Sequence, residues 1–137
     1  MRYIILAVFA VLSSLSCHSQ KSAQFLACTQ KDGTQAGLDH CASDEAARRD
    51  ADLNRTYQQL RSKAKQSPGA TEKIERAELA WIQYRDAYLD SMFPAEDKQA
   101  NYGSIYPMDF ALLRADLTQE QTKRLKELIK QYVGDAQ

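Results

Sequence analysis

The sequence predicts a single all-α domain, an antiparallel hairpin of two long helices covered by one short and one medium C-terminal helix, with a disulfide-stapled N-terminal loop. Apolar side chains recur at steps of three and four residues over most of the chain, which is the spacing of one helix face. No alternating run of β-branched residues occurs outside the N-terminal apolar segment. A chain of 137 residues is long enough for one compact core and too short for two.

The first sixteen residues have the pattern of a secretory signal peptide. Arg2 supplies a positive charge, residues 3–12 form an unbroken apolar run, and residues 13–16 are small and mostly polar. An apolar run of ten residues is shorter than the roughly 20 residues that a membrane-spanning helix needs. We therefore expect export to the periplasm or out of the cell, with residues 17–27 as a flexible leader and residues 28–134 as the helical domain.

Cys17 directly follows this segment and leaves two fates open for the mature N-terminus. Ser14 and Ser16 have the small side chains that ordinary signal peptidase requires before a cut. Cys17 is also a candidate for lipid attachment, although a typical lipoprotein signal has Leu three positions before its cysteine, where Ser14 stands here. The protein is therefore expected to be either free in the exported compartment or lipid-anchored at Cys17.

Cys28 and Cys41 predict a disulfide bond, because the compartment beyond the inner membrane is oxidising and the two residues are close in sequence. In the chain-entropy model, closing a loop of this size stabilises a fold by about 3 kcal/mol. A metal site of Cys28, His40 and Cys41 is the rival reading. Adjacent residues rarely point at one ion and no fourth ligand has suitable spacing, so we expect no bound metal.

The first long helix is expected from about Asp44, capped by Ser43 or Asp44, to the breaker residues 67–69. Its predicted inward face consists of Ala46, Asp50, Leu53, Tyr57, Leu60 and Ala64. The second long helix is expected to be capped by Thr71 and to end at Phe93 and Pro94. Its predicted inward face consists of Ile74, Ala77 or Glu78, Trp81, Arg85, Tyr88 and Met92.

After a polar loop at residues 95–103, the remaining chain predicts two further helices. Pro107 suits the first turn of a short helix that places Met108 and residues 110–113 against the core. Thr118 with Gln121 fits a capping box for the final helix. The apolar stripe of that helix consists of Leu125, Leu128, Ile129, Tyr132 and Val133, and it is expected to stop near Gly134.

Two charged residues interrupt the apolar faces of the long helices. In a hairpin that turns near Pro68, Leu53 lies opposite Trp81 and Asp50 lies opposite Arg85. A lone charge in such a seam is costly, so we predict a partly buried Asp50–Arg85 ion pair with hydrogen bonds from Asn54 and Tyr84. Such a pair more often sets the helix register than performs chemistry, and we interpret it as structural.

These segments resemble the LprI-type lysozyme inhibitor family, formerly a domain of unknown function. The resemblance covers about residues 28–128. It is carried by Cys28 and Cys41-Ala42, by Asp-x-x-Leu-Asn-x-x-Tyr at residues 50–57, by Trp-x-x-Tyr-Arg-Asp at residues 81–86, by Gly103-Ser104 and by Leu117-Thr118. It implies an exported helical domain, sometimes lipid-anchored, for which lysozyme inhibition is described in some members.

The chain departs from the family pattern at two places. A second cysteine pair, common in the family, falls at Leu89 and Leu113 here, and we expect these leucines to touch each other in the core with Leu53, Tyr57, Leu60 and Trp81. The family's arginine three residues after the Leu-Thr threonine is replaced by Gln121.

Composition and motif content favour protein binding over other functions. Lys and Arg number 18 against 18 Asp and Glu, so the chain has no basic field for nucleic acid. His18 lies in the leader and His40 beside a disulfide, which leaves no general base for a Ser or Cys nucleophile. We therefore expect no catalysis and no cofactor.

The expected partner is a lysozyme or another peptidoglycan hydrolase. The alternative is that the chain is an immunity or envelope-assembly protein with a different periplasmic partner. The candidate binding surface is the loop of residues 96–104, where Glu96 and Asp97 are acidic and Tyr102 adjoins a flexible Gly103.

Overall fold

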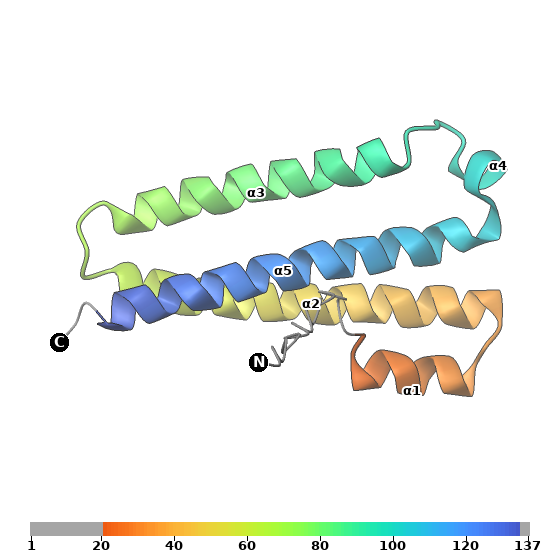
Figure 1. Ribbon diagram of the computed structural model, residues 1–137, viewed down its shortest axis with the longest axis horizontal. Helices are drawn as coiled ribbons and strands as arrows, with labels where there is room; N and C mark the ends of the chain where they lie inside the picture. The colour runs from red at the N-terminus through yellow and green to blue at the C-terminus, as the bar shows by residue number, and fades with distance from the viewer. Residues whose placement is uncertain (1–20, 135–137) are drawn as a thin grey trace, which may run out of the picture.

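The computed structural model describes residues 21–134, and this part of the chain is helical with no strand (Figure 1). The predicted signal peptide, Cys17 and His18 lie outside the described residues. None of the helices in residues 21–134 combines the length and hydropathy needed to cross a bilayer. The elements are α1 (Ala23–Lys31), α2 (Gln35–Ala64), α3 (Ala70–Met92), α4 (Lys98–Tyr102), the 3-10 turn η1 (Gly103–Ile105) and α5 (Tyr106–Gly134).

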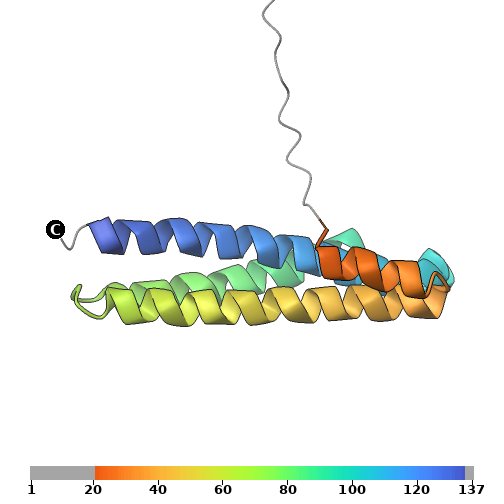
Figure 2. The ribbon, with the colours of Figure 1, turned by 90° about the horizontal axis from the view of Figure 1, so that it is seen from below.

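The predicted all-α class is confirmed, and the centre of the fold is a pair of long helices, α2 and α5, that run in the same direction (Figure 1). In sequence, α3 comes between α2 and α5 and is antiparallel to both. Figures 1 and 2 show α1 and α3 on opposite sides of the α2–α5 pair. The hairpin of α2 and α3 is present, but α2 packs far more extensively against α5 than against α3.

The main core lies where α2, α3 and α5 meet. Its buried members are Leu53, Leu60, Ala64, Ala70, Ile74, Trp81 and Leu125. Tyr57, Ile82, Leu128, Ile129 and Tyr132 pack against it and are partly buried. Leu60, on α2, is fully buried in this cluster.

A smaller core fastens α1 to the other side of the long pair. Phe25 is the buried residue of α1, and it joins Cys41 and Ala42 of α2. Met108, Ala111 and Leu112 of α5 pack against the same cluster. The disulfide between Cys28 and Cys41 joins α1 to α2 covalently, with a Cα–Cα distance of 5.7 Å.

The predicted leader and stapled loop are more ordered than expected. Residues 23–27 belong to α1, which Ser22 caps by accepting a hydrogen bond from the Phe25 amide at 3.0 Å. The first long helix begins at Gln35 with Thr34 as its cap, so the predicted cap at Ser43 or Asp44 was wrong. Its added turns bury Gly37, Cys41 and Ala42, whose small side chains make a weak hydrophobic signal.

The turn between α2 and α3 depends on a glycine. Gly69 is the N-cap of α3 and has φ of +71°, a left-handed conformation that side chains with a Cβ rarely adopt. The predicted cap at Thr71 was therefore wrong by two positions, because Thr71 lies inside the helix. The predicted stop is correct, since α3 ends at Met92 with Phe93 as its C-cap.

The two predicted C-terminal helices form one continuous helix, α5, of 29 residues. Pro107 lies in its first turn and Gly134 is its last residue, and no other Pro or Gly stands between them to break it. Thr118 is consequently not a cap but a fully buried residue in the middle of the helix. A Thr-x-x-Gln spacing occurs inside helices as well as at their starts, which explains the error.

Candidate partner-binding surfaces

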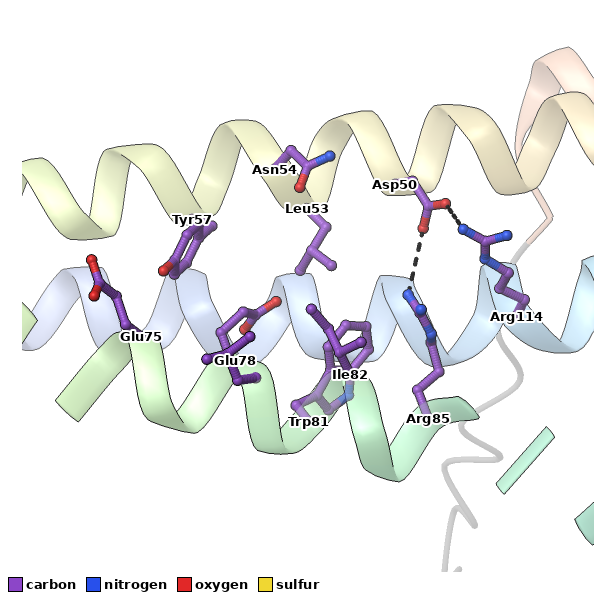
Figure 3. A pocket seen from close by; sticks show the side chains of 11 residues that line it. Asp50, Leu53, Asn54, Tyr57, Glu75, Glu78, Trp81, Ile82, Arg85 and Arg114 are labelled. Atoms are coloured by element: carbon purple, nitrogen blue, oxygen red, sulfur yellow. Dashed lines mark hydrogen bonds and ion pairs between the residues drawn. The ribbon is translucent and has the colours of Figure 1, made fainter. Parts of the chain in front are cut away.

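The ion pair expected between the two long helices is part of a larger cluster around Asp50 (Figure 3). Arg85 Nη1, on α3, lies 4.0 Å from Asp50 Oδ1, on α2. Arg114, on α5, donates a hydrogen bond to Asp50 Oδ2, and Thr118 Oγ1 donates one to Asp50 Oδ1 at 3.3 Å. Asp50 is therefore bound by groups from both neighbouring helices, and Arg114 is its closer basic partner.

Arg85 has further contacts that hold its guanidinium over the apolar core. Its Nε donates to Asp86 Oδ1 at 2.8 Å, and its Cζ lies 5.2 Å from the centroid of the Trp81 ring. The two polar residues expected to add hydrogen bonds to the Asp50–Arg85 pair lie at the surface. Asn54 is exposed, and Tyr84 is 57% exposed with its ring 5.9 Å from that of Tyr88. Thr118 supplies the hydrogen bond expected from these two residues.

An open cleft of about 430 Å³ lies between α2 and α3 (Figure 3). Leu53 and Trp81 are buried residues of its apolar lining, and Leu79 stands at its rim with 62% of its surface exposed. At one end of the cleft lie the charged groups Asp50, Arg85 and Arg114. At the other end lie Tyr57, Glu75 and Glu78.

Glu78 is a buried carboxylate at the acidic end of this cleft. It is 7% exposed, and its Oε2 accepts a hydrogen bond from Gln121 Nε2 at 2.9 Å. Burial raises the pKa of Glu78, while the hydrogen bond from Gln121 and the positive charge of Arg85 oppose the rise only in part. Its neighbour Glu75 is ion-paired with Arg61, with Oε1 2.6 Å from Nη2.

A second buried glutamate, Glu45, lies on the α1 side of α2 and has a different environment. Its carboxylate is bound by Arg48 at 2.9 Å, by Arg49 at 2.8 Å and by the hydroxyl of Ser22, the α1 cap. Burial alone would raise the pKa of Glu45, but the hydrogen bonds from Ser22 and Arg48 and the charge of Arg49 together lower it. Glu45 therefore ties α1 to α2 as an ionised side chain.

The candidate binding loop at residues 96–104 contains the short helix α4 and the first two residues of η1, and several of its side chains make contacts within the fold. Asp97 caps α4 by accepting from the Ala100 amide at 2.9 Å. The Tyr102 hydroxyl accepts from the Ala95 amide at 3.0 Å. Gly103 has φ of +70° and forms the turn into η1, and Glu96 is exposed.

The Tyr102 ring belongs to an aromatic cluster that closes this end of the molecule. It packs edge-on against Phe93, with 5.4 Å between centroids, and stacks on Tyr106 at 5.9 Å. Phe110 of α5 completes the cluster. Tyr102 is thus a structural contact as well as a surface residue.

The residues of the rival metal site have other contacts. Cys28 and Cys41 are joined as a disulfide, and His40 Nε2 lies 3.5 Å from Asp44 at the surface. Within residues 21–134, no group of three or more His, Cys, Asp or Glu side chains is arranged to hold a metal ion.

Comparison with known proteins places this arrangement in a family. The family model described as "Lysozyme inhibitor LprI" matches residues 27–125, which include the disulfide, the Asp50 cluster and the cleft. The chain belongs to the LprI lysozyme inhibitor family. An uncharacterised protein of Rhizobium meliloti (strain 1021) is 31% identical over 108 residues, covering 71% of this chain and 75% of the relative. No solved structure matches this LprI family member.

The LprI resemblance is confirmed, and the structure shows where its departures lie. Leu89 is buried and Leu113 is partly buried, and direct contact between them stays a prediction. Gln121, at the position of the family's arginine, is buried and bound to Glu78. Gln121 therefore fixes the carboxylate of Glu78, which lines the cleft.

Sequence reasoning missed several polar residues that organise this LprI domain. They are Glu45, Arg114, Thr118 in its interior role, and the Glu78–Gln121 pair. A signal for two of them was available, because Arg114 and Thr118 are four residues apart and share one face of a continuous helix. That signal was hidden by the expectation that a new helix starts at Thr118.

Proposed function

We propose that this protein is exported and inhibits a lysozyme by binding to it, which protects the peptidoglycan of the producing cell. The observation that carries the proposal is the match of the lysozyme inhibitor family to residues 27–125, nearly the whole of the described domain. The N-terminal sequence supports export, because residues 1–16 have the order of charges and apolar residues found in signal peptides.

The architecture suits binding by a preformed surface. Long helices joined by short turns, a disulfide between α1 and α2, and charge clusters between helices limit motion of the backbone. A rigid inhibitor loses little conformational entropy when it binds, so a modest contact area can give useful affinity. Inhibition then requires only that the bound protein exclude the polysaccharide substrate from the enzyme.

The test is a lysis assay with a panel of lysozymes of different classes. The protein is expressed from its full-length gene into an oxidising compartment, purified, and added to each enzyme before the cell-wall substrate. We expect a concentration-dependent loss of lysis with at least one enzyme. The proposal is wrong if every enzyme in the panel keeps its full activity at a saturating concentration of the protein.

Residues 96–104 are the sequence-based proposal for the contact surface, and Glu96→Gln is the variant that tests it. Glu96 is exposed and its substitution leaves the Asp97 cap and the Tyr102 contacts intact, so any loss of inhibition reports on binding. Glu72→Gln on α3 is the matched control, because Glu72 is also exposed and lies outside residues 96–104.

A further inference from the structure

The cleft between α2 and α3 has an apolar lining and charged groups at both ends, and the two ends differ in their charge balance. At the Asp50 end, the guanidinium groups of Arg85 and Arg114 are matched by the carboxylates of Asp50 and Asp86. This end of the cleft is therefore neutralised within the protein, and it offers little attraction to an additional ion.

The opposite end holds more negative than positive charge. Glu75 and Glu78 are three residues apart on α3 and both line the cleft (Figure 3). Arg61 forms an ion pair with Glu75. Among the described residues, no Lys, Arg or His lies within ion-pair distance of Glu78, and the hydrogen bond that it accepts comes from a neutral amide.

A buried carboxylate without a cation costs free energy in the folded protein, and a cation brought into the cleft would reduce that cost. Leu79 adds an exposed apolar surface beside the same carboxylate. A ligand that complements both features combines a positive charge with apolar groups on either side. A protein surface with a Lys or Arg side chain among apolar residues has this combination.

We propose that the Glu75–Glu78 end of the cleft receives a basic side chain from the partner protein, and that Leu79 packs against apolar residues around it. This inference rests on the proposed function, in which the partner is a lysozyme. The buried carboxylate of Glu78 gives the cation a low-dielectric partner, so this contact provides specificity as well as attraction.

The first experiment measures inhibition by Glu75→Gln/Glu78→Gln, using a lysozyme that the wild-type protein inhibits. We expect the inhibition constant to rise at least about tenfold, which is the loss expected for one well-buried charge pair. Glu72→Gln is the matched control, because Glu72 is exposed on the same helix and is not among the residues that line the cleft. The control should stay within about twofold of the wild-type inhibition constant.

The second experiment observes the cleft directly. Trp81 is the single tryptophan of the chain and lines the cleft, so 5-fluorotryptophan labelling gives one fluorine NMR signal that reports on this site. Addition of the unlabelled lysozyme should shift that signal in the wild-type protein and in Glu72→Gln. A lysozyme that is inhibited normally without shifting the signal, or that the double variant inhibits as well as the wild-type protein does, would overturn the inference.

A capped Leu-Arg-Leu peptide, with capped Leu-Gln-Leu as its neutral match, separates this inference from the proposed function. If no lysozyme is inhibited but the arginine peptide alone shifts the signal in a Glu78-dependent way, the proposed function fails and the cleft still binds a basic protein segment. If no lysozyme is inhibited and neither lysozyme nor peptide shifts the signal, both the proposed function and this inference fail. A signal that moves with protein concentration alone would assign the cleft to a second copy of the chain and overturn the inference.

Discussion

The two sides of the α2–α5 pair each contain a buried glutamate, and the pKa values of the two glutamates are shifted in opposite directions. On the α1 side, Glu45 is bound by Arg48, Arg49 and Ser22, and these groups lower its pKa despite burial. On the α3 side, Glu78 accepts a hydrogen bond from Gln121, and burial raises its pKa. The first carboxylate is paired with two arginines, while the second has a neutral amide as its hydrogen-bond partner and lines the cleft between α2 and α3.

This difference separates residues that hold the protein together from residues available for binding. Removing one member of a buried ion pair is costly, because the remaining charges are left uncompensated. A buried charge without a cation is tolerated at a cost, and such costs are characteristic of binding sites. We therefore propose that the buried charge on the α1 side is structural and that the α3 side is available for recognition, and the variants below test that proposal.

The largest effect is expected from the disulfide on the α1 side. Cys28→Ser/Cys41→Ser should lower the free energy of unfolding by about 3 kcal/mol, because the unfolded chain loses a cross-link between residues 13 apart. Urea unfolding followed by circular dichroism measures the change. Wild-type protein unfolded with a reductant should show the same midpoint as the double variant, and a clearly higher midpoint would contradict the prediction.

Glu45→Gln is expected to cost about 2 kcal/mol at pH 7, because it removes the buried negative charge to which Arg48 and Arg49 are bound. The pKa of Glu45 is lowered in the folded protein, so its stabilising effect exists above pH 4.5, the ordinary pKa of glutamic acid, and is lost as the pH falls through the lowered value. The penalty measured by urea unfolding should therefore shrink toward pH 3. An equal penalty at pH 7 and at pH 3 would disprove the role of its charge.

Arg85→Ala should destabilise the protein by about 1.5 kcal/mol, through the lost ion pair and the lost packing on Trp81. The cost stays moderate because Asp50 keeps its hydrogen bonds from Arg114 and Thr118. Thermal unfolding measures this loss of stability, and Arg76→Ala is the control because Arg76 is exposed on the same helix. A loss of 3 kcal/mol or more would mean that Arg85 alone compensates the Asp50 charge.

Glu78→Gln should act in the opposite direction and stabilise the protein by about 1 kcal/mol at pH 7, since a neutral amide still accepts from Gln121 and carries no buried charge. The pKa of Glu78 is raised in the folded state, so the wild-type protein loses stability as the pH rises from 4.5 through that raised value. The gain should therefore disappear near pH 4. A variant that is less stable at pH 7 would show that ionised Glu78 has a structural role.

Much of the fold was predictable from side-chain periodicity. The sequence identified the buried helix faces that contain Leu53, Leu60, Ile74 and Trp81. Large apolar residues at helical spacing mark the face of a helix that packs into the core. The helical turns around Gly37 and Cys41 were missed, because their buried face is made of small residues. The continuity of α5 was missed because Thr118 and Gln121 have the spacing of a cap.

The sequence by itself determined the helical class, the cysteine pairing, the family and the opposition of Asp50 to Arg85, since each depends on local spacing or on pairing across one turn. Only the tertiary structure decided that α2 has α5 as its main neighbour, that Arg114 reaches Asp50, and that Glu78 lines the cleft with the neutral amide of Gln121 as its hydrogen-bond partner. Those features depend on how three helices are placed around one another. Such placement follows from the packing of the whole core, which residue spacing along a single helix does not encode.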